Sequence, residues 1–349
     1  VAGVAAVTVD AGFEAAVPPP PAPFHEGEGR RLPHPAAGAT GVWVPGRWFF
    51  VGVLVWIGVG WGSTQPLGKI ATGGGQGPFG LLFWQLVVCV IVLGLVALVR
   101  RKGLKLTREA LRFYVIVAVL GTLIPNATFY ISVARLPAGI MSILVSTVPM
   151  IAFPLALALG MDRFSMRRLA GLLLGLAGVL LIALPGAGLP EAAMLAYLPV
   201  ALIAPMFYAI EATYVARTGT RGMDGLQAMF GASLAGLILC LPVTLMLGQW
   251  YWPMPFGKPD AALVISSALH ALLYSTYVWL AASAGSVFAS QASYLVTASG
   301  MVWAMVLLGE RFSPPVWLAM AAMLAGVALV RPRRRTAAEP AETGETCSA

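Results

Sequence analysis

The chain has 349 residues, of which 59% are hydrophobic and only 10% are charged. Soluble domains carry about 25% charged residues, so this composition excludes an ordinary soluble domain and indicates an integral membrane protein. The 22 Lys and Arg residues outnumber the 14 Asp and Glu residues, but they lie beside apolar stretches, as membrane orientation requires. The basic excess is therefore no argument for nucleic-acid binding. Without a Cys or His cluster, a nucleophile elbow or a phosphate-binding loop, we expect no metal, no cofactor and no enzyme activity.

The N-terminal segment, residues 1–47, is rich in Ala, Pro and Gly and contains four consecutive prolines, Pro18 to Pro21. It offers little that could form a core, so we predict a disordered cytoplasmic tail. No compact apolar region with a cleavage site precedes the first apolar span, so a cleaved signal peptide is not expected. Residues 331–349 are basic and then polar and small, and we predict a second cytoplasmic tail there.

Between the tails, apolar stretches of about membrane-spanning length follow one another, separated by short segments that hold most of the charges. The uncharged stretch between Asp260 and Glu310 is long enough for two spans, and we place the break at Ala284-Gly285. We predict ten helical spans, at Trp48–Leu67, Pro78–Val99, Phe113–Val133, Pro137–Leu159, Leu169–Ile182, Ala192–Ala216, Leu226–Leu247, Ala261–Ala282, Ser286–Leu308 and Pro314–Val330.

Two stretches 148 residues apart are copies of one another. Asp162-Arg163-Phe164-Ser165 leads into Leu-Ala-Gly-Val at residues 176–179, and Glu310-Arg311-Phe312-Ser313 leads into the same four residues at 324–327. The period is too long for a solenoid, so we interpret it as a duplicated half. We therefore predict a first five-helix repeat over residues 48–185 and a second over residues 186–330.

The basic residues predict how the spans are oriented. With the amino terminus in the cytoplasm, 18 of the 22 Lys and Arg residues fall on the cytoplasmic side, and only Lys69, Arg135, Lys258 and Arg311 fall outside. Each half has an odd number of spans, so the second repeat is predicted to be inverted relative to the first, with both termini cytoplasmic. Inverted repeats place a substrate site near the bilayer midplane and lend themselves to alternating access.

These features together resemble a known family. Trp61-Gly62-Ser63-Thr64 is similar to the Trp-Gly turn in the first helix of the drug/metabolite transporter superfamily, and Gly309-Glu310-Arg311 with the following Leu-Ala-Gly-Val resembles the end of an EamA-type repeat. The resemblance covers Phe49 to Val330. It implies a ten-helix inner-membrane exporter of small metabolites or drugs, with a cavity lined by helices one to four and six to nine.

The chain departs from that pattern at two positions. Gln85 follows Trp84 where many relatives have an aromatic-Arg pair, so a charge that would pair with an anion is absent. Thr297 stands where the first repeat has Pro149, so the fourth and ninth helices need not kink alike.

Two ionisable residues lie clearly within spans, and such residues usually face a cavity. Glu211 lies in the sixth span, and His270 lies in the eighth span. We predict that both contribute to substrate binding or to coupling with protons, since burial raises the pKa of carboxylates and imidazole titrates near neutrality. The structural alternatives are a carboxylate that reaches the interface or pairs with a neighbouring helix, and a neutral His hydrogen-bonded between helices.

Uncharged polar and aromatic residues within the spans complete the predicted cavity lining. Each has a competing structural interpretation, because hydrogen bonds between helices also serve packing and tryptophans also anchor helix ends. The candidates are Asn126, Gln85, Trp61, Tyr208, Tyr274, Gln291 and Tyr294.

The sequence thus predicts an all-α integral membrane protein, a secondary active transporter that exports a small metabolite, amino acid-like or related, by alternating access. Its partners would be a small-molecule substrate, the lipid bilayer and protons as the coupling ion, with no nucleic acid. One alternative is a multidrug efflux transporter. The other is a membrane scaffold or sensor without transport activity, in which the repeat is only ancestral.

Overall fold

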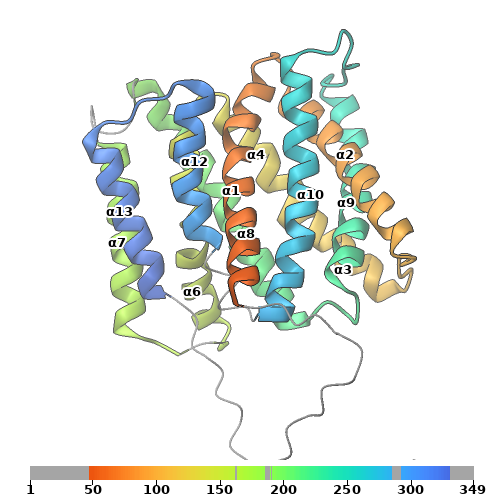
Figure 1. Cartoon of the computed structure of the whole chain (residues 1–349), viewed down its shortest axis with the longest axis horizontal. Coiled ribbons are helices and arrows are strands. Elements are labelled where there is room, and N and C mark those ends of the chain that lie inside the picture. Colours follow the sequence, from red (N-terminus) through yellow and green to blue (C-terminus); the bar gives the residue numbers. More distant parts are fainter. Residues whose placement is uncertain (1–46, 162, 185–188, 190, 285–291, 331–349) are drawn as a thin grey trace, which may run out of the picture. The chain divides into compact units, whose positions relative to one another are not determined.

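The computed structural model describes residues 47–161, 163–184, 189, 191–284 and 292–330. All regular secondary structure in these ranges is helical (Figure 1). The two predicted tails therefore lie outside the described residues, apart from Arg47, and so do Gln291 and Gly285 of the predicted break.

Helices lie at each of the predicted spans, and three spans consist of consecutive helical segments. The elements are α1 (Arg47–Thr72), α2 (Pro78–Val99), α3 (Arg108–Ala118), η1 (Val119–Leu123), α4 (Ile124–Val133), α5 (Ala138–Val145), α6 (Val148–Ala158), α7 (Met166–Ala183), η2 (Ala192–Tyr197), α8 (Leu198–Thr218), α9 (Gly225–Met246), α10 (Lys258–Ala284), α12 (Ala292–Leu308) and α13 (Pro314–Val330).

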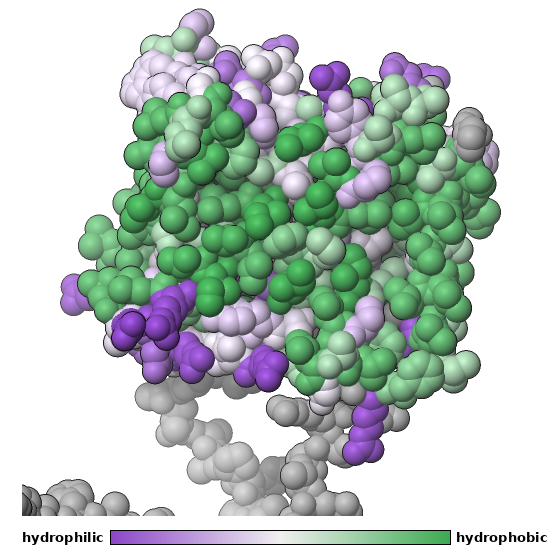
Figure 2. Space-filling view, turned by 180° about the vertical axis from the view of Figure 1, so that it is seen from behind, coloured by the Kyte–Doolittle hydropathy of each residue, from purple (hydrophilic) through white to green (hydrophobic). Residues whose placement is uncertain are grey.

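Length and composition make seven of the described helical segments able to cross a membrane: Trp48–Thr72, Pro78–Val99, Arg108–Val133, Ala138–Ala158, Met166–Ala183, Ala192–Thr218 and Gly225–Met246. The shorter apolar helices α12 and α13 follow near the end. Figure 2 shows a broad apolar belt with hydrophilic residues gathered above and below it. A multi-pass helical membrane protein has this surface, because lipid tails offer polar groups no hydrogen bonds.

The third predicted span contains a turn of π-helix, η1, between α3 and α4. The N–H of Ile124 donates to the carbonyl of Val119, five residues back. Pro125 follows directly, and it has no N–H for the carbonyl of Gly121 and would collide with it in a regular α-helix. The wider turn accommodates the proline, and it is a departure from the regular span predicted from the sequence.

The fourth predicted span is interrupted between α5 and α6 at Ser146-Thr147. The amides of both residues donate to carbonyls only three residues back, and Pro149 opens the next helix. In the second repeat α12 runs without interruption from Ala292 to Leu308, with Thr297 inside it. The expectation that these two helices need not kink alike is confirmed for the described residues.

Glycines bring α7 close to α13 and α6. A Cβ added at Gly326 would lie 2.6 Å from the carbonyl oxygen of Gly171, and one added at Gly178 would lie 3.0 Å from that of Ala319. Gly175 faces Met150 of α6, and a Cβ added at Gly175 would lie 1.9 Å from the Met150 sulfur. The glycines of α7 therefore serve close helix packing, as small residues do in membranes.

Polar contacts at one end of the bundle connect the segment after α2 with the segment before α9. Lys102 forms an ion pair with Asp224, and Lys105 donates to the carbonyl of Gly222. Asp224 also caps α9 by accepting from the N–H of Gln227 at 2.8 Å. Partial burial opposes ionisation of Asp224, but the hydrogen bonds from Lys102 and Gln227 outweigh it and hold the pKa of Asp224 below its usual value.

A different set of contacts, the main-chain clamp, holds the turn between α4 and α5. The carboxylate of Glu310, which follows α12, accepts from the N–H of Ala138 at 2.7 Å and of Gly139 at 3.0 Å. Lys69 of α1 donates to the carbonyls of Val133 at 3.1 Å and Leu136 at 2.7 Å. The turn thus has its free N–H groups matched by an anion and its free carbonyls matched by a cation.

Glu310 and Asp162 lie at loop edges in the sequence, where acidic residues commonly cap helices or form ion pairs. Glu310 is a helix cap for α5, because both of its oxygens accept main-chain N–H groups. Asp162, its counterpart in the first repeat, lies outside the described residues.

Candidate binding cavity

A cavity of about 370 Å³ lies between the helices of the two halves. It is lined by residues from α1, α2, α3, η1, α4, α5 and α6 on one side of the sequence and from α8, α9, α10 and α12 on the other. Among the described residues, α7 and α13 contribute none, as the family resemblance implies for the fifth and tenth helices. Its volume falls in the range of small-molecule sites, about 300–1,000 Å³.

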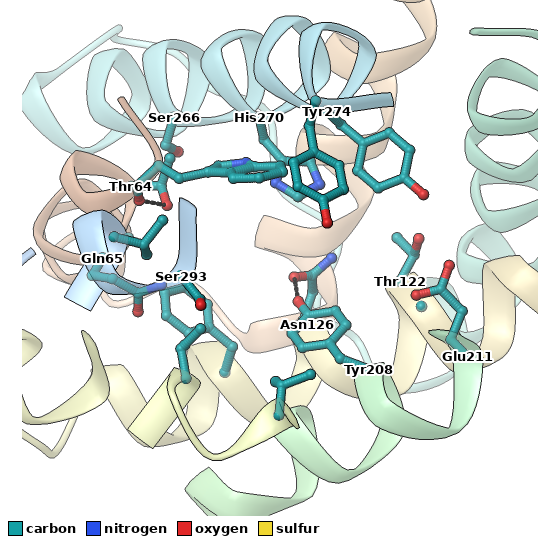
Figure 3. Close-up of a pocket in the computed structure, with 18 of the residues that line it drawn as sticks. Thr64, Gln65, Thr122, Asn126, Tyr208, Glu211, Ser266, His270, Tyr274 and Ser293 are labelled. Carbon is teal, nitrogen blue, oxygen red and sulfur yellow. Dashed lines mark hydrogen bonds between the residues drawn. The ribbon is translucent and has the colours of Figure 1, made fainter. Parts of the chain in front are cut away.

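Glu211 of α8 points into this cavity at one end, beside Thr122 (Figure 3). Within the part of the chain that the structure describes, its carboxylate has neither a hydrogen bond nor an ion pair. It lies against the π-helical turn: a Cβ added at Gly121 would come within 2.6 Å of the Glu211 carboxyl carbon. The glycine therefore leaves room for the carboxylate, and π-turns are frequent at functional sites.

An aromatic wall faces the cavity from α1 and α10. The ring of Trp61 lies 6.4 Å from that of Tyr274, 5.5 Å from that of Tyr277 and 6.3 Å from that of His270, between centroids. These are ordinary aromatic contact distances. His270 therefore lies among rings, about midway along the cavity in Figure 3.

Two hydrogen-bonded pairs connect side chains across the lining. The hydroxyl of Tyr208 on α8 donates to Asn126 Oδ1 on α4 at 3.2 Å, which joins the two halves of the chain. The hydroxyl of Tyr130 donates to the buried Gln85 Oε1 at 2.8 Å. Asn126, Gln85 and Tyr208 thus line the cavity and also form hydrogen bonds between helices, and their role in substrate binding stays a prediction.

Of the sequence-predicted site residues, the structure brings seven into the lining: Trp61, Gln85, Asn126, Tyr208, Glu211, His270 and Tyr274. Tyr294 is not among the lining residues, because its neighbours Ala292, Ser293 and Val296 occupy the cavity face of α12 and Tyr294 packs against the apolar core. Gln291 lies outside the described residues.

The end of the cavity opposite Glu211 is polar and uncharged in its described residues, and none of the predicted site residues lies there. It contains Thr64, Gln65, Ser266 and Ser293 (Figure 3). The buried Gln65 Oε1 has no hydrogen-bond partner among the described residues. A signal was present, since Ser266, His270, Tyr274 and Tyr277 recur at helical spacing on one face of α10.

The fold and the cavity define a class: a multi-pass helical membrane protein whose central cavity is lined by both halves of the chain. The model of the EamA-like transporter family matches residues 48–184 and 195–331. The chain therefore belongs to the EamA-like transporter family, which is consistent with the drug/metabolite transporter superfamily. Members of this family are membrane transporters and not enzymes. The predicted repeat boundary at residues 185 and 186 falls between the two matches and stays a prediction.

Comparison with solved structures gives the same architecture. One chain, described as "Crystal structure of protein", is similar with a TM-score of 0.56 and 18% sequence identity, over 79% of this chain and 94% of that chain. At this identity the likeness concerns the fold alone. No match was found among the curated proteins.

Proposed function

We propose that this chain is a secondary active exporter of a small organic molecule that works by alternating access, with Glu211 as the group that carries the coupled proton. The observation that carries the proposal is the cavity itself, since both matched repeats line it and an unpaired carboxylate points into it. A charged side chain within the membrane is costly, and transporters retain one where it binds a substrate or relays a proton.

We further propose ten membrane crossings in two inverted repeats, in the inner membrane, with both termini in the cytoplasm. The placement of 18 of the 22 basic residues on one side supports this orientation. The described helical region also begins with α1 and ends with α13 at the same end of the bundle (Figure 1), as an even number of crossings requires.

Reporter fusions test the inverted topology. Fusions after Arg112 and after Arg221 are expected to report a cytoplasmic location, and fusions near Gly186 and Lys258 an external one. The physical reason is the retention of Lys- and Arg-rich segments on the cytoplasmic side. A cytoplasmic signal at Lys258 would remove the basis for the inversion.

A flux assay tests transport itself. Cells with and without the protein are first compared for accumulation of candidate solutes, and the solutes that differ are then loaded into proteoliposomes. Transport predicts efflux that requires the protein and saturates with solute concentration. A scaffold or sensor predicts the same leak as protein-free vesicles, and this outcome for every solute would overturn the proposal. Arg163→Ala and Glu191→Gln, both outside the cavity lining, serve as matched variants that should keep full flux.

A further inference from the structure

The charge content of the cavity indicates what kind of molecule it accepts. Among the described residues that line the cavity, Glu211 is the one carboxylate, and none is Lys or Arg. The other titratable groups there are His270 and the tyrosines Tyr130, Tyr208, Tyr274 and Tyr277. A ligand with a net negative charge would meet an unpaired carboxylate and no cation, which is unfavourable at membrane depth.

The interruption between α5 and α6 offers little to replace a missing cation. Its neighbours Val145, Val148 and Pro149 line the cavity, and half-helix N-termini bind anions in some transporters. Here the amides of Ser146 and Thr147 already donate to Ile143 and Leu144, and Pro149 has no N–H to give. A carboxylate or phosphate group on a ligand would find only the amides of Val148 and Met150 at this helix start, and none of the described lining residues adds a Lys or Arg.

The features that suit a cation are all present. Glu211 is unpaired within the described residues, and aromatic rings surround the space between it and the far end of the cavity. The aromatic residues that line the cavity are Trp61, Phe129, Tyr130, Tyr208, Tyr274 and Tyr277. Aromatic faces attract ammonium groups, most strongly when water is excluded.

We propose that the substrate is a monovalent organic cation, an alkylated or protonated amine with an apolar body, and not a zwitterionic amino acid. Its ammonium group lies at Glu211, between Tyr208 and Tyr274. Its body lies past His270, against which Trp61 packs, toward the neutral polar end formed by Thr64, Gln65, Ser266 and Ser293 (Figure 3). This inference rests on the proposed transport function, because it names the class of molecule that the same cavity carries.

Binding of three probes with similar bodies and different charges tests the inference. The probes are benzyltrimethylammonium, phenylalanine and 3-phenylpropionate, titrated calorimetrically into the purified full-length protein. We expect the cation to bind and the zwitterion and the anion to bind at least about tenfold more weakly, since their carboxylates face an unpaired Glu211. Tetraethylammonium and tetraphenylphosphonium extend the series to a smaller and a larger cation.

Variants then assign the binding to Glu211. Glu211→Gln is expected to weaken cation binding at least about tenfold by removing the ionic attraction, whereas Glu191→Gln, outside the cavity, should leave it unchanged. Glu211→Asp keeps the charge and should retain the preference for the cation with weaker binding. If Glu211→Gln does not elute as a folded protein, the ranking of the three probes on the parent protein decides the ligand charge.

Several results would overturn the inference: tighter binding of phenylalanine or 3-phenylpropionate than of benzyltrimethylammonium, unchanged cation binding in a folded Glu211→Gln variant, or no binding by any of the three cations. The transport proposal is tested by a separate measurement, flux in proteoliposomes. Cation binding without flux refutes transport and leaves the ligand class standing. Flux of phenylalanine without cation binding refutes the ligand class and leaves the transport proposal standing.

Discussion

Replacing Glu211 by Gln is expected to abolish substrate flux driven by a pH gradient while the protein still inserts and folds. Proton coupling requires a group that releases its proton on one side and takes it up on the other, and an amide cannot do so. In the part of the lining that the structure describes, Glu211 is the one carboxylate, and no described side chain neutralises it. The loss should therefore reach the rate of protein-free vesicles.

The measurement is substrate efflux from vesicles under an imposed pH gradient, for the parent, Glu211→Gln, Glu211→Asp and His270→Ala. Glu211→Asp should retain part of the flux, because it keeps a titratable carboxylate. His270→Ala is expected to lose less than Glu211→Gln, since the imidazole lies among the rings of Trp61 and Tyr274 and contributes to the wall. Undiminished gradient-driven flux in Glu211→Gln would leave Glu211 as a structural carboxylate and refute the coupling role.

Replacing Glu310 by Ala is expected to destabilise the protein by about 2 kcal/mol. The substitution removes both acceptors from the N-terminus of α5, where a charged cap and its hydrogen bonds contribute about this much. The buried thiols of Cys89 and Cys240 provide the measurement, because a thiol-reactive dye labels them as the protein unfolds on heating. The assay uses a Cys347→Ser background so that only these two thiols respond.

Two variants bracket that result. Glu310→Gln keeps one acceptor oxygen and should lose less stability than Glu310→Ala. Glu191→Ala removes an exposed carboxylate that caps no main-chain group in the described structure, and it should change the stability by no more than about 0.5 kcal/mol. Equal melting temperatures for Glu310→Ala and Glu191→Ala would show that the cap contributes nothing measurable.

The sequence predicted the helical architecture and the family well, because both leave a long-range signal in the chain. Apolar length located the spans, and the duplicated Leu-Ala-Gly-Val segments pointed to the two repeats. The turn of π-helix at Val119–Leu123 left no such signal. Pro125 predicts an irregularity in the helix there, but a kink, a break or a wider turn can each accommodate a proline.

The site was predicted in part for a similar reason. Glu211 and His270 were found because charge or titratable character is rare within spans. Gln65 and Ser293 were missed because single uncharged polar residues are common between membrane helices and serve packing equally well. Tyr294 was misplaced into the lining because only the rotation of α12 decides between it and its neighbour Ser293. That rotation depends on packing against helices from the other half.

The main-chain clamp on the turn between α4 and α5 has a consequence for variation in this chain. Lys69 and Glu310, from opposite ends of the folded region, bind backbone atoms of the turn and no side chain of it. Substituting the side chains of Val133 or Leu136 leaves the clamped atoms in place, so the cost of such a change lies in the packing of the core, where both side chains are fully buried. Gly139 is limited by space as well, since a Cβ there would lie 2.2 Å from the ring of Phe312. Substitutions of the turn's side chains therefore leave its electrostatic contacts unchanged. The signs of the two charges that bind the turn cannot change, because exchanging Lys69 with Glu310 would place each charge against the wrong end of the peptide dipole.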